Sequence, residues 1–281
     1  ADPSSPWIGA PVIVRTNRER HTLTDVLSRQ YARAHGKVVI RWPARKSKWY
    51  GKPKLPAALN EAMKDPAFYE YYVDGADGFI SSIINKKRFL VNGTWIKYHS
   101  LVPCHDEQVE FLAHEMAQSQ PGDVITLSEP PAAINVELVD EDLNQVHLWS
   151  DATVVPGKVV LPMVPHLGPQ YSNTTPTPIP GYMGLFSPSR VVFNNHFPLD
   201  LAFAITTNKA QGCTLEYVIL ALSPKAGLKC GMEYSDIYVA LSRVKHRKYI
   251  RLLITGFPHE CWAKLSYLSN LELDPSIQSF F

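Results

Sequence analysis

Short apolar runs, each bounded by turn residues, mark the start of the chain. Residues 11–16 (PVIVRT) form a β-rich run, and residues 18–35 carry apolar side chains at helical spacing. Asn17 is placed to cap that helix, and Gly36 stands where a helix should end. Residues 38–42 (VVIRW) form the next apolar run. Strand, helix and strand in this order predict a parallel strand–helix–strand unit.

The pattern changes in the middle of the chain. Asn92-Gly93 between two short apolar runs predicts a β-hairpin, and residues 107–117 have the periodicity of a helix. Residues 68–78 are aromatic, acidic and turn-rich, and residues 167–188 are rich in Pro, Thr and Ser, which favours a long surface loop. Further elements are expected as strands at residues 89–91, 94–98, 123–127, 132–138 and 154–164, and as a helix at residues 55–64.

Strands and helices alternate again from residue 190 onward. Strands are expected at residues 191–193, 201–205, 217–222 and 249–254, and a helix at residues 235–244. The run YVILAL at 217–222 is apolar on both faces, as a central parallel strand must be. The chain therefore predicts one α/β domain built from residues 7–45 and 187–281, interrupted by a mostly β insertion at residues 46–186.

Composition narrows the class of protein but not its partners. With 281 residues, of which 45% are hydrophobic and 19% charged, the chain is large enough for one or two ordinary globular domains. The net charge of +2 neither demands nor excludes nucleic acid, so a local basic stripe would have to decide. No apolar run approaches the ~18 residues that a membrane helix needs, and no membrane partner is expected.

The spacing of cysteine and histidine predicts no metal site. The four cysteines form no C-x-x-C pair, and we expect ordinary thiols of a reducing compartment rather than zinc ligands or disulfides. His105, Glu107 and His114 could suggest a metal, but the two histidines are nine residues apart. A helix cap with an exposed polar face is the expected arrangement. The apolar face of that helix is expected to include Val109 and Met116.

The helix predicted at residues 235–244 carries a cation away from its apolar face. Its apolar side chains share one face, and Arg243 lies well away from it. One interpretation is a solvated helix end whose positive charge interacts with the helix dipole. The other is an arginine finger, because a guanidinium is permanently charged and offers a planar fork to phosphate oxygens. Glu233, just before the helix, is expected to be a cap rather than a catalytic acid.

A polar loop follows the strand predicted at residues 201–205. Because ligands of open α/β sheets bind beyond the carboxyl ends of the strands, this loop is a candidate binding site. Small donors there can hold a nucleic-acid backbone, and a lysine can offer a point charge to a phosphate. The alternative is an ordinary polar turn between two buried strands. The candidate side chains of the loop are Thr206, Thr207, Asn208, Lys209, Gln211 and Gly212.

Cations and aromatic rings are interleaved after the second apolar run. Lys46 and Lys48 stand beside Trp49 in this segment. Such a pattern suits single-stranded nucleic acid, because the cations follow the phosphates and the rings stack on bases. The alternative is a solvated linker whose tryptophans pack on the domain.

Two runs near the end of the chain resemble conserved motifs of a helicase family. FAITTNKAQGCT at residues 203–214 and YVALSRV at residues 238–244 are similar to motifs V and VI of superfamily 1B DNA helicases of the PIF and RecD type. VIVRTN near the start resembles motif IV, and FLVNGT at residues 89–94 resembles a hairpin in the small β insertion of that group. Residues 122–138 and the run RLLITGF also resemble segments of PIF-type helicases that are encoded by eukaryotic mobile elements such as Helitrons.

This resemblance implies a fold and a set of roles. The fold would be a RecA-like parallel sheet with helices on both faces, interrupted by an SH3-like insertion. Arg243 would sense the γ-phosphate of ATP, and Lys209 would be a phosphate-side or coupling cation. Gln211 and Gly212 would line the nucleotide cleft, and Asn208 stands where the family pattern has His. Contacts with single-stranded DNA are expected from Thr16, Asn17, Thr206, Asn208, Thr214, Lys46, Lys48 and Trp49.

The chain lacks the signatures of the other half of such a motor. No Gly-Lys pair is followed by Ser or Thr, and no strand ending in an Asp-Glu pair is evident. The resemblance implies that ATP and Mg²⁺ are bound mainly by an N-terminal RecA-like domain, supplied in cis or in trans, and that this chain alone hydrolyses no ATP. It also implies an intracellular protein, nuclear or mitochondrial, with roles in DNA repair or recombination. The alternative is a catalytically dead, transposon-derived fragment that binds nucleic acid or protein.

Overall fold

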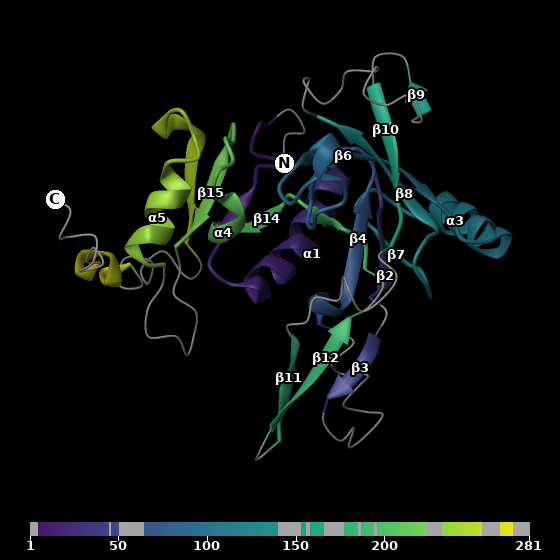
Figure 1. The fold of residues 1–281 in the computed structure, drawn as a ribbon, viewed down its shortest axis with the longest axis horizontal. Coiled ribbons are helices and arrows are strands. Elements are labelled where there is room, and N and C mark those ends of the chain that lie inside the picture. The colour runs from purple at the N-terminus through teal and green to yellow at the C-terminus, as the bar shows by residue number, and fades with distance from the viewer. Residues whose placement is uncertain are drawn as a thin grey trace. The chain divides into compact units, whose positions relative to one another are not determined.

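The structure is a computed structural model with a mixed α/β fold (Figure 1). The chain divides into two compact units. The first, here called the end unit, joins residues 4–24 to residues 202–281, and the second, the central unit, consists mainly of residues 25–201. The structure describes residues 5–44, 46–50, 65–139, 153–155, 158–165, 177–184, 187–193, 196–222, 232–254 and 265–271.

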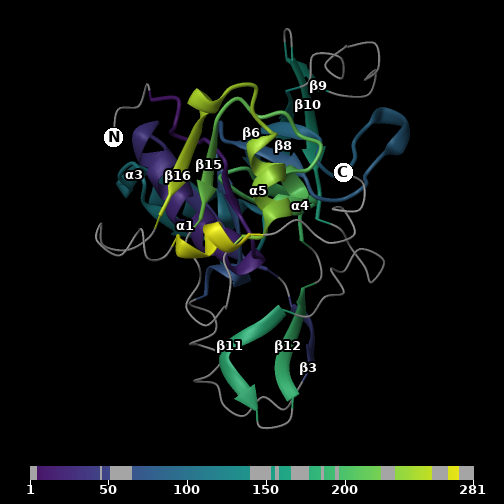
Figure 2. The same cartoon turned by 90° about the vertical axis from the view of Figure 1, so that its left-hand side faces the viewer.

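A four-stranded parallel sheet forms the core of the end unit. β1 (Val12–Val14) lies between β14 (Ala204–Thr206) and β15 (Val218–Ala221), and β16 (Ile250–Leu253) follows β15. Figure 2 shows β15 and β16 side by side. Every residue of β1 is buried, as expected for a central parallel strand that is covered on both faces. The strand expected at residues 249–254 is β16, which lies at the edge of the sheet, and its Leu252 is 54% exposed.

Two helices of the end unit pack against each other. α4 (Thr207–Ala210) starts directly after β14, and α5 (Tyr234–Leu241) lies against it, as Figure 2 also shows. Glu233 occupies the cap position of α5, and its N–H donates a hydrogen bond to Asp236 Oδ2 at 3.1 Å. The prediction that Glu233 caps this helix is therefore confirmed.

α1 (Asn17–Ala34) begins with a reciprocal pair of hydrogen bonds. Thr16 Oγ1 accepts from the N–H of Glu19 at 3.3 Å, and Glu19 Oε2 accepts from the N–H of Thr16 at 3.0 Å. The cap is thus Thr16, and the prediction of Asn17 was wrong because Asn17 already belongs to the first turn. The helix ends before Gly36, whose φ of +67° favours glycine.

An antiparallel sheet of six strands forms the largest layer of the central unit, in the order β13-β5-β6-β8-β10-β9. Its strands are β5 (Asp77–Ile80), β6 (Trp95–Val102), β8 (Ala133–Leu138), β9 (Thr153–Val155), β10 (Lys158–Met163) and β13 (Leu199–Leu201). Five of these strands fall within residues 46–186, where the sequence predicts a mostly β insertion, and β13 lies beyond that range. The single strand expected at residues 154–164 is a pair, β9 and β10, joined in antiparallel register.

A second, mixed sheet of the central unit is built around β2 (Val39–Pro43). This strand pairs antiparallel with β4 (Tyr69–Val73) and parallel with β7 (Val124–Thr126). The predicted strand–helix–strand unit is consequently wrong, because β1 and β2 lie in different sheets. The partner β4 comes from the aromatic stretch described as turn-rich, where Tyr and Val favour a strand.

α3 (Asp106–Gln118) is the helix that follows β6 in the central unit. Leu112 is buried, but Val109 and Met116 are 49% and 52% exposed. The helix places Val109 and Met116 on the same face as Leu112, as predicted, but much of that face is exposed to solvent. Short 3-10 helices lie at Pro66–Phe68, Lys86–Arg88, Arg247–Tyr249 and Ser266–Asn270. Among the described residues, no helix combines the length and the hydrophobicity of a membrane span.

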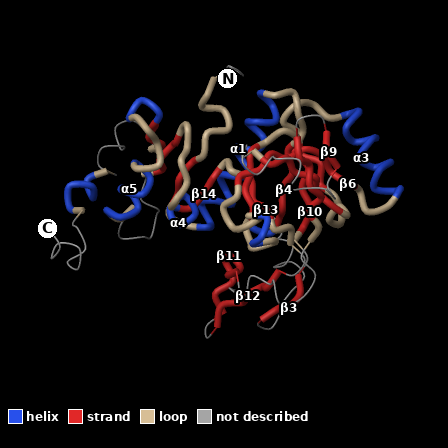
Figure 3. The backbone as a smooth tube through the Cα atoms, turned by 45° about the horizontal axis from the view of Figure 1, so that its top comes forward, coloured by secondary structure: helices blue, strands red, loops and turns tan. Residues whose placement is uncertain are grey.

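A third sheet of three strands is visible in Figure 3, where β12 (Ser187–Phe193) lies between β11 (Thr177–Gly184) and β3 (Lys46–Tyr50). The long loop expected at residues 167–188 is thus partly strand, because β11 pairs with β12. The helix expected at residues 55–64 lies outside the described residues.

The turn at Asn92-Gly93 exists, but the predicted hairpin partner was wrong. Gly93 has a φ of +94°, and the strand after it, β6, pairs with β5. Residues 89–91 do not pair with it, because Leu90 instead forms a bridge with Asn85 and closes a small loop.

Candidate functional site

The candidate site of the end unit lies where β1 and β14 end. The two strands are parallel, and Val14 stands opposite Thr206, so Arg15 and Thr207 emerge at the same edge of the sheet. Thr207 opens α4 and is only 5% exposed. The edge of the sheet predicted to bind ligands therefore carries one cation and one buried hydroxyl.

The first turn of α5 ties this edge together. Thr207 Oγ1 donates to Asp236 Oδ1 at 2.9 Å, and Arg15 Nε lies 3.8 Å from Asp236 Oδ2. Arg15 also forms an ion pair with Glu233. Because Arg15 directly follows β1, Thr207 opens α4 and Asp236 lies in α5, the Asp236 carboxylate connects three segments that are far apart in the sequence.

Arg243 follows α5 and contacts the segment between α4 and β15. Its Nη1 donates to the carbonyl oxygen of Cys213 at 3.2 Å, and its own carbonyl oxygen accepts from the N–H of Leu215 at 2.9 Å. The Nε of Arg243 donates to the carbonyl oxygen of Val239 at 2.9 Å, and Nη2 donates to Ser242 Oγ at 2.7 Å. The side chain is half-buried, so it is neither a freely solvated helix end nor part of the apolar interior.

The other predicted residues of the end unit differ in their accessibility. Lys209 is half-buried, and its carbonyl oxygen accepts from Cys213 Sγ at 3.4 Å. Gly212 has a φ of +86°, and a Cβ built there meets no atom within 4 Å, so the backbone of this turn is open to approach. The remaining exposed positions are Asn17, Asn208, Gln211 and Thr214, and the half-buried ones are Thr16 and Thr206.

The basic run predicted to contact DNA belongs to the central unit. Lys46, Lys48 and Trp49 lie in β3, where their backbones pair with β12. Their side chains lie outside the described part of the structure. The structure thus brings Arg243 and the loop 206–214 together in one unit but does not place these three residues in it.

Sequence reasoning missed Arg15 and Asp236. Both could be recognised only as local features: Arg15 directly follows an apolar strand, and Asp236 stands at the third helical position after the cap Glu233. The pairing between them joins residues more than two hundred positions apart, and no spacing rule indicates it.

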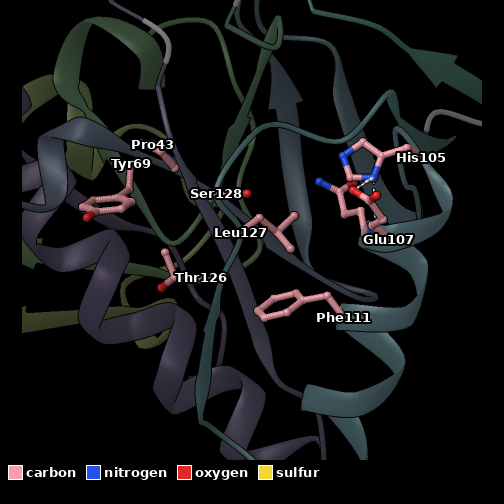
Figure 4. A pocket seen from close by; sticks show the side chains of 9 residues that line it. Pro43, Tyr69, His105, Glu107, Phe111, Thr126, Leu127 and Ser128 are labelled. Carbon is pink, nitrogen blue, oxygen red and sulfur yellow. Dashed lines mark hydrogen bonds and ion pairs between the residues drawn. The ribbon is translucent and has the colours of Figure 1, made fainter.

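A separate pocket of about 520 Å³ lies in the central unit. Figure 4 shows Tyr69 and Thr126 at one end and His105 and Glu107 at the other. Arg41 lies over the Tyr69 ring, 4.3 Å from its centroid, and Arg41 Nε donates to Thr126 Oγ1 at 3.0 Å. The pocket has the size of a small-molecule site, but the interactions of its polar groups serve the fold.

His105 at the rim of this pocket caps α3. Its Nδ1 accepts from the N–H of Gln108 at 3.1 Å, and its Nε2 lies 2.6 Å from Glu129 Oε1. Cys104, His105 and Glu129 have possible ligand atoms within 4.8 Å of one another. Both ring nitrogens of His105 have hydrogen-bond partners, and the predicted helix cap is present.

The chain is similar to proteins that are named as DNA helicases of the PIF type. No protein-family model matches the chain. A stretch of 67 residues, 24% of the chain, is 39% identical to ATP-dependent DNA helicase PIF6 of Trypanosoma brucei brucei, of which it covers 8%. The chain is similar over 98% of its length to a Pif1 helicase from Candida albicans, with 15% identity and a TM-score of 0.46. A Bacteroides Pif1 helicase in complex with ADP-AlF3 and ssDNA aligns with 16% identity and a TM-score of 0.45. The chain covers 50% and 46% of these two solved chains, about half of each.

Proposed function

We propose that this chain, which resembles part of a PIF-type superfamily 1B DNA helicase, is the second motor half of an ATP-dependent DNA helicase. In this role it provides the arginine finger and contacts with single-stranded DNA. A separate RecA-like half, in the same polypeptide or another, holds ATP and Mg²⁺. The chain spans about half the length of the solved relatives. ATP hydrolysis and DNA unwinding are therefore proposed for the complete protein and not for this chain alone.

The observation that carries the proposal is the joining of two motif-like segments through Arg243. Its side chain and its backbone both bond to the segment between α4 and β15. A displacement of Cys213 in the loop 206–214 would therefore alter a hydrogen bond of the Arg243 guanidinium. This is the coupling that a motor needs between its DNA contacts and its nucleotide.

The hydrogen-bond partners of Arg243 favour a role toward phosphate. The three acceptors are neutral oxygens: the carbonyls of Val239 and Cys213 and the hydroxyl of Ser242. A phosphate oxygen is a stronger partner, because charge-assisted hydrogen bonds are about twice as strong as neutral ones. The guanidinium can therefore turn to a γ-phosphate without breaking an ion pair. Lys209, Gln211 and Gly212 are proposed to lie on the nucleotide side.

The loop after β14 supplies the proposed DNA contacts. Asn208 and Thr214 are exposed donors beside Thr206, and the open backbone at Gly212 allows a phosphate to approach. In the proposal, Arg15 and Asp236 hold this loop in place and contact neither ligand.

The chain offers only part of an ATP site. Its cations suit the charge of a transferred phosphoryl group, but its sequence has no Gly-Lys-Ser or Gly-Lys-Thr loop to surround the β-phosphate or to hold Mg²⁺. We therefore expect no ATP hydrolysis by this polypeptide alone. DNA-stimulated phosphate release by the isolated chain would contradict this expectation.

The decisive experiment uses the complete protein that contains a phosphate loop together with this chain. Arg243→Ala should lower DNA-stimulated phosphate release at least ~10³-fold while the affinity for single-stranded DNA is retained. Arg247→Ala, which removes an exposed cation of the same basic run, should change neither quantity. Unchanged turnover in Arg243→Ala would overturn the proposal.

One observation favours a second function. All three donor nitrogens of Arg243 are engaged inside the chain, which also fits a structural role in a non-catalytic fragment that binds nucleic acid or protein. In that case Arg243→Ala would lower stability and have no separate effect on turnover.

A further inference from the structure

A loop of the central unit presents an aromatic ring to solvent. Phe89 is 64% exposed. It is also the only residue other than glycine with a positive φ in the described part of the chain, at 56°. This backbone region is unfavourable for side chains with a Cβ, and such conformations persist where the surroundings impose them. The conformation and the exposure together set Phe89 apart from an ordinary loop residue.

Hydrogen bonds stabilise the loop on both sides of Phe89. Asn85 Oδ1 accepts from the N–H groups of Lys87 and Arg88, at 3.1 and 3.2 Å. Thr94 Oγ1 donates to the carbonyl oxygen of Phe89 at 2.8 Å. The next residue, Leu90, is buried and forms a bridge with Asn85. The ring is thus held in an exposed position by its neighbours, and little ordering is needed before it binds a partner.

The surroundings of the ring are basic. Lys86 and Lys87 are exposed on the short helix that leads into Phe89, and Arg88 follows them. Ile83, 51% exposed, lies just before this turn. An exposed ring beside two ammonium groups complements a polyanion with planar groups, because the ring can stack on a base while the cations meet the phosphates. An apolar protein surface would not require the cations.

We propose that Phe89 stacks on a base of single-stranded DNA and that Lys86 and Lys87 contact the neighbouring phosphates. The inference rests on the proposed function, and it adds a DNA contact in the central unit that is separate from the loop 206–214. Its specificity is low, since every base has a face on which a ring can stack.

The test measures binding of fluorescent oligo-dT to the complete chain by anisotropy, over a series of salt concentrations. Phe89→Gly removes the ring and suits the positive φ, so it should fold at least as stably as the wild type and bind about tenfold more weakly. Lys86→Ala with Lys87→Ala should reduce the slope of log affinity against log salt by about 1.4, from ~0.7 per phosphate contact. Met116→Ala, which removes another exposed apolar side chain, is the matched control.

A second oligonucleotide separates base from backbone contacts. An oligomer with abasic sites should bind the wild type and Phe89→Gly equally well, because it offers nothing to stack on. If the wild type binds oligo-dT and Phe89→Gly binds equally tightly, the inference is wrong and the proposed function stands. If the wild type does not bind oligo-dT, both fail. Phe89-dependent binding to vesicles of anionic lipid, without binding to oligo-dT, would assign the loop to membranes and overturn the inference.

Discussion

The guanidinium of Arg243 lies 3.2 Å from the carbonyl oxygen of Cys213. A side chain that follows α5 is therefore hydrogen-bonded to the turn that follows α4. Its removal should therefore affect the fold as well as the proposed chemistry. Arg243→Ala loses three hydrogen bonds to partly exposed partners, and we expect the free energy of unfolding to fall by about 1–2 kcal/mol.

Arg243→Lys separates the contribution of the positive charge to stability from that of the planar guanidinium group. A lysine keeps the positive charge but offers no planar fork, so it cannot bond Val239 and Cys213 together. Urea unfolding should place this variant close to Arg243→Ala, with Arg247→Ala at the wild-type value. A fully stable Arg243→Lys would show that charge alone, and not the fork, matters at this position.

Thr207 is expected to stabilise the end unit through its hydroxyl group. Because Thr207 is buried and donates to Asp236, Thr207→Val should lower the free energy of unfolding by about 1–3 kcal/mol at nearly constant shape. Thr207→Ser retains the donor and should recover most of the loss. Thr214→Val, at an exposed position of the same loop, should have little effect. Chemical denaturation of the four proteins measures the difference, and equal stabilities of Thr207→Val and Thr214→Val would refute the role.

The strands of the parallel sheet could be predicted from local sequence, but the choice of pairing partner for each apolar run could not. β1 is buried on both faces and β15 is buried on one face and half-buried on the other, and both show in the sequence as unbroken apolar stretches. β2 has the same appearance, yet it pairs with β4 in another sheet. The choice of partner depends on contacts between distant segments, which periodicity does not encode.

The candidate site shows the same limit. Arg243 and Lys209 could be singled out because they stand inside motif-like runs. Arg15 and Asp236 are ordinary residues in the sequence, and only the fold brings them within 3.8 Å of each other. Phe89 stands at the start of the run FLVNGT, but the sequence could not single it out as an exposed ring, because exposure and a positive φ are properties of the folded loop.

Gly78 is predicted to be intolerant of any side chain. A Cβ at this position would lie 2.5 Å from Tyr98 Cε2 and 2.9 Å from the carbonyl oxygen of Asp200. The second contact is with backbone, which cannot move aside without shifting β13. Gly78→Ala should therefore lower the free energy of unfolding by about 1–3 kcal/mol. Asp77→Ala, at the exposed preceding position of β5, should change it far less. Thermal unfolding at equal concentration tests both.

Glu70 is expected to make the stability of the central unit depend on pH. Trp42 Nε1 donates to Glu70 Oε2 at 2.7 Å, and the N–H of Phe197 donates to Oε1 at 3.0 Å. Burial raises the pKa of Glu70 to about 8 from 4.5, although both hydrogen bonds act in the opposite direction. Between these two pH values the folded protein retains a proton that the unfolded chain has lost. The free energy of unfolding should therefore fall as the pH rises through this window.

Urea unfolding of the wild type and Glu70→Gln at several pH values between about 5 and about 8 tests this dependence. The amide cannot ionise, so the decline with pH should be smaller in the variant. At pH 5 the variant should be less stable by about 1 kcal/mol, because its NH₂ group cannot accept the second hydrogen bond. Glu107→Gln makes the same chemical change at a side chain that is 93% exposed, and it should preserve the wild-type pH dependence. Parallel curves for the wild type and Glu70→Gln would mean that Glu70 is ionised in the folded protein.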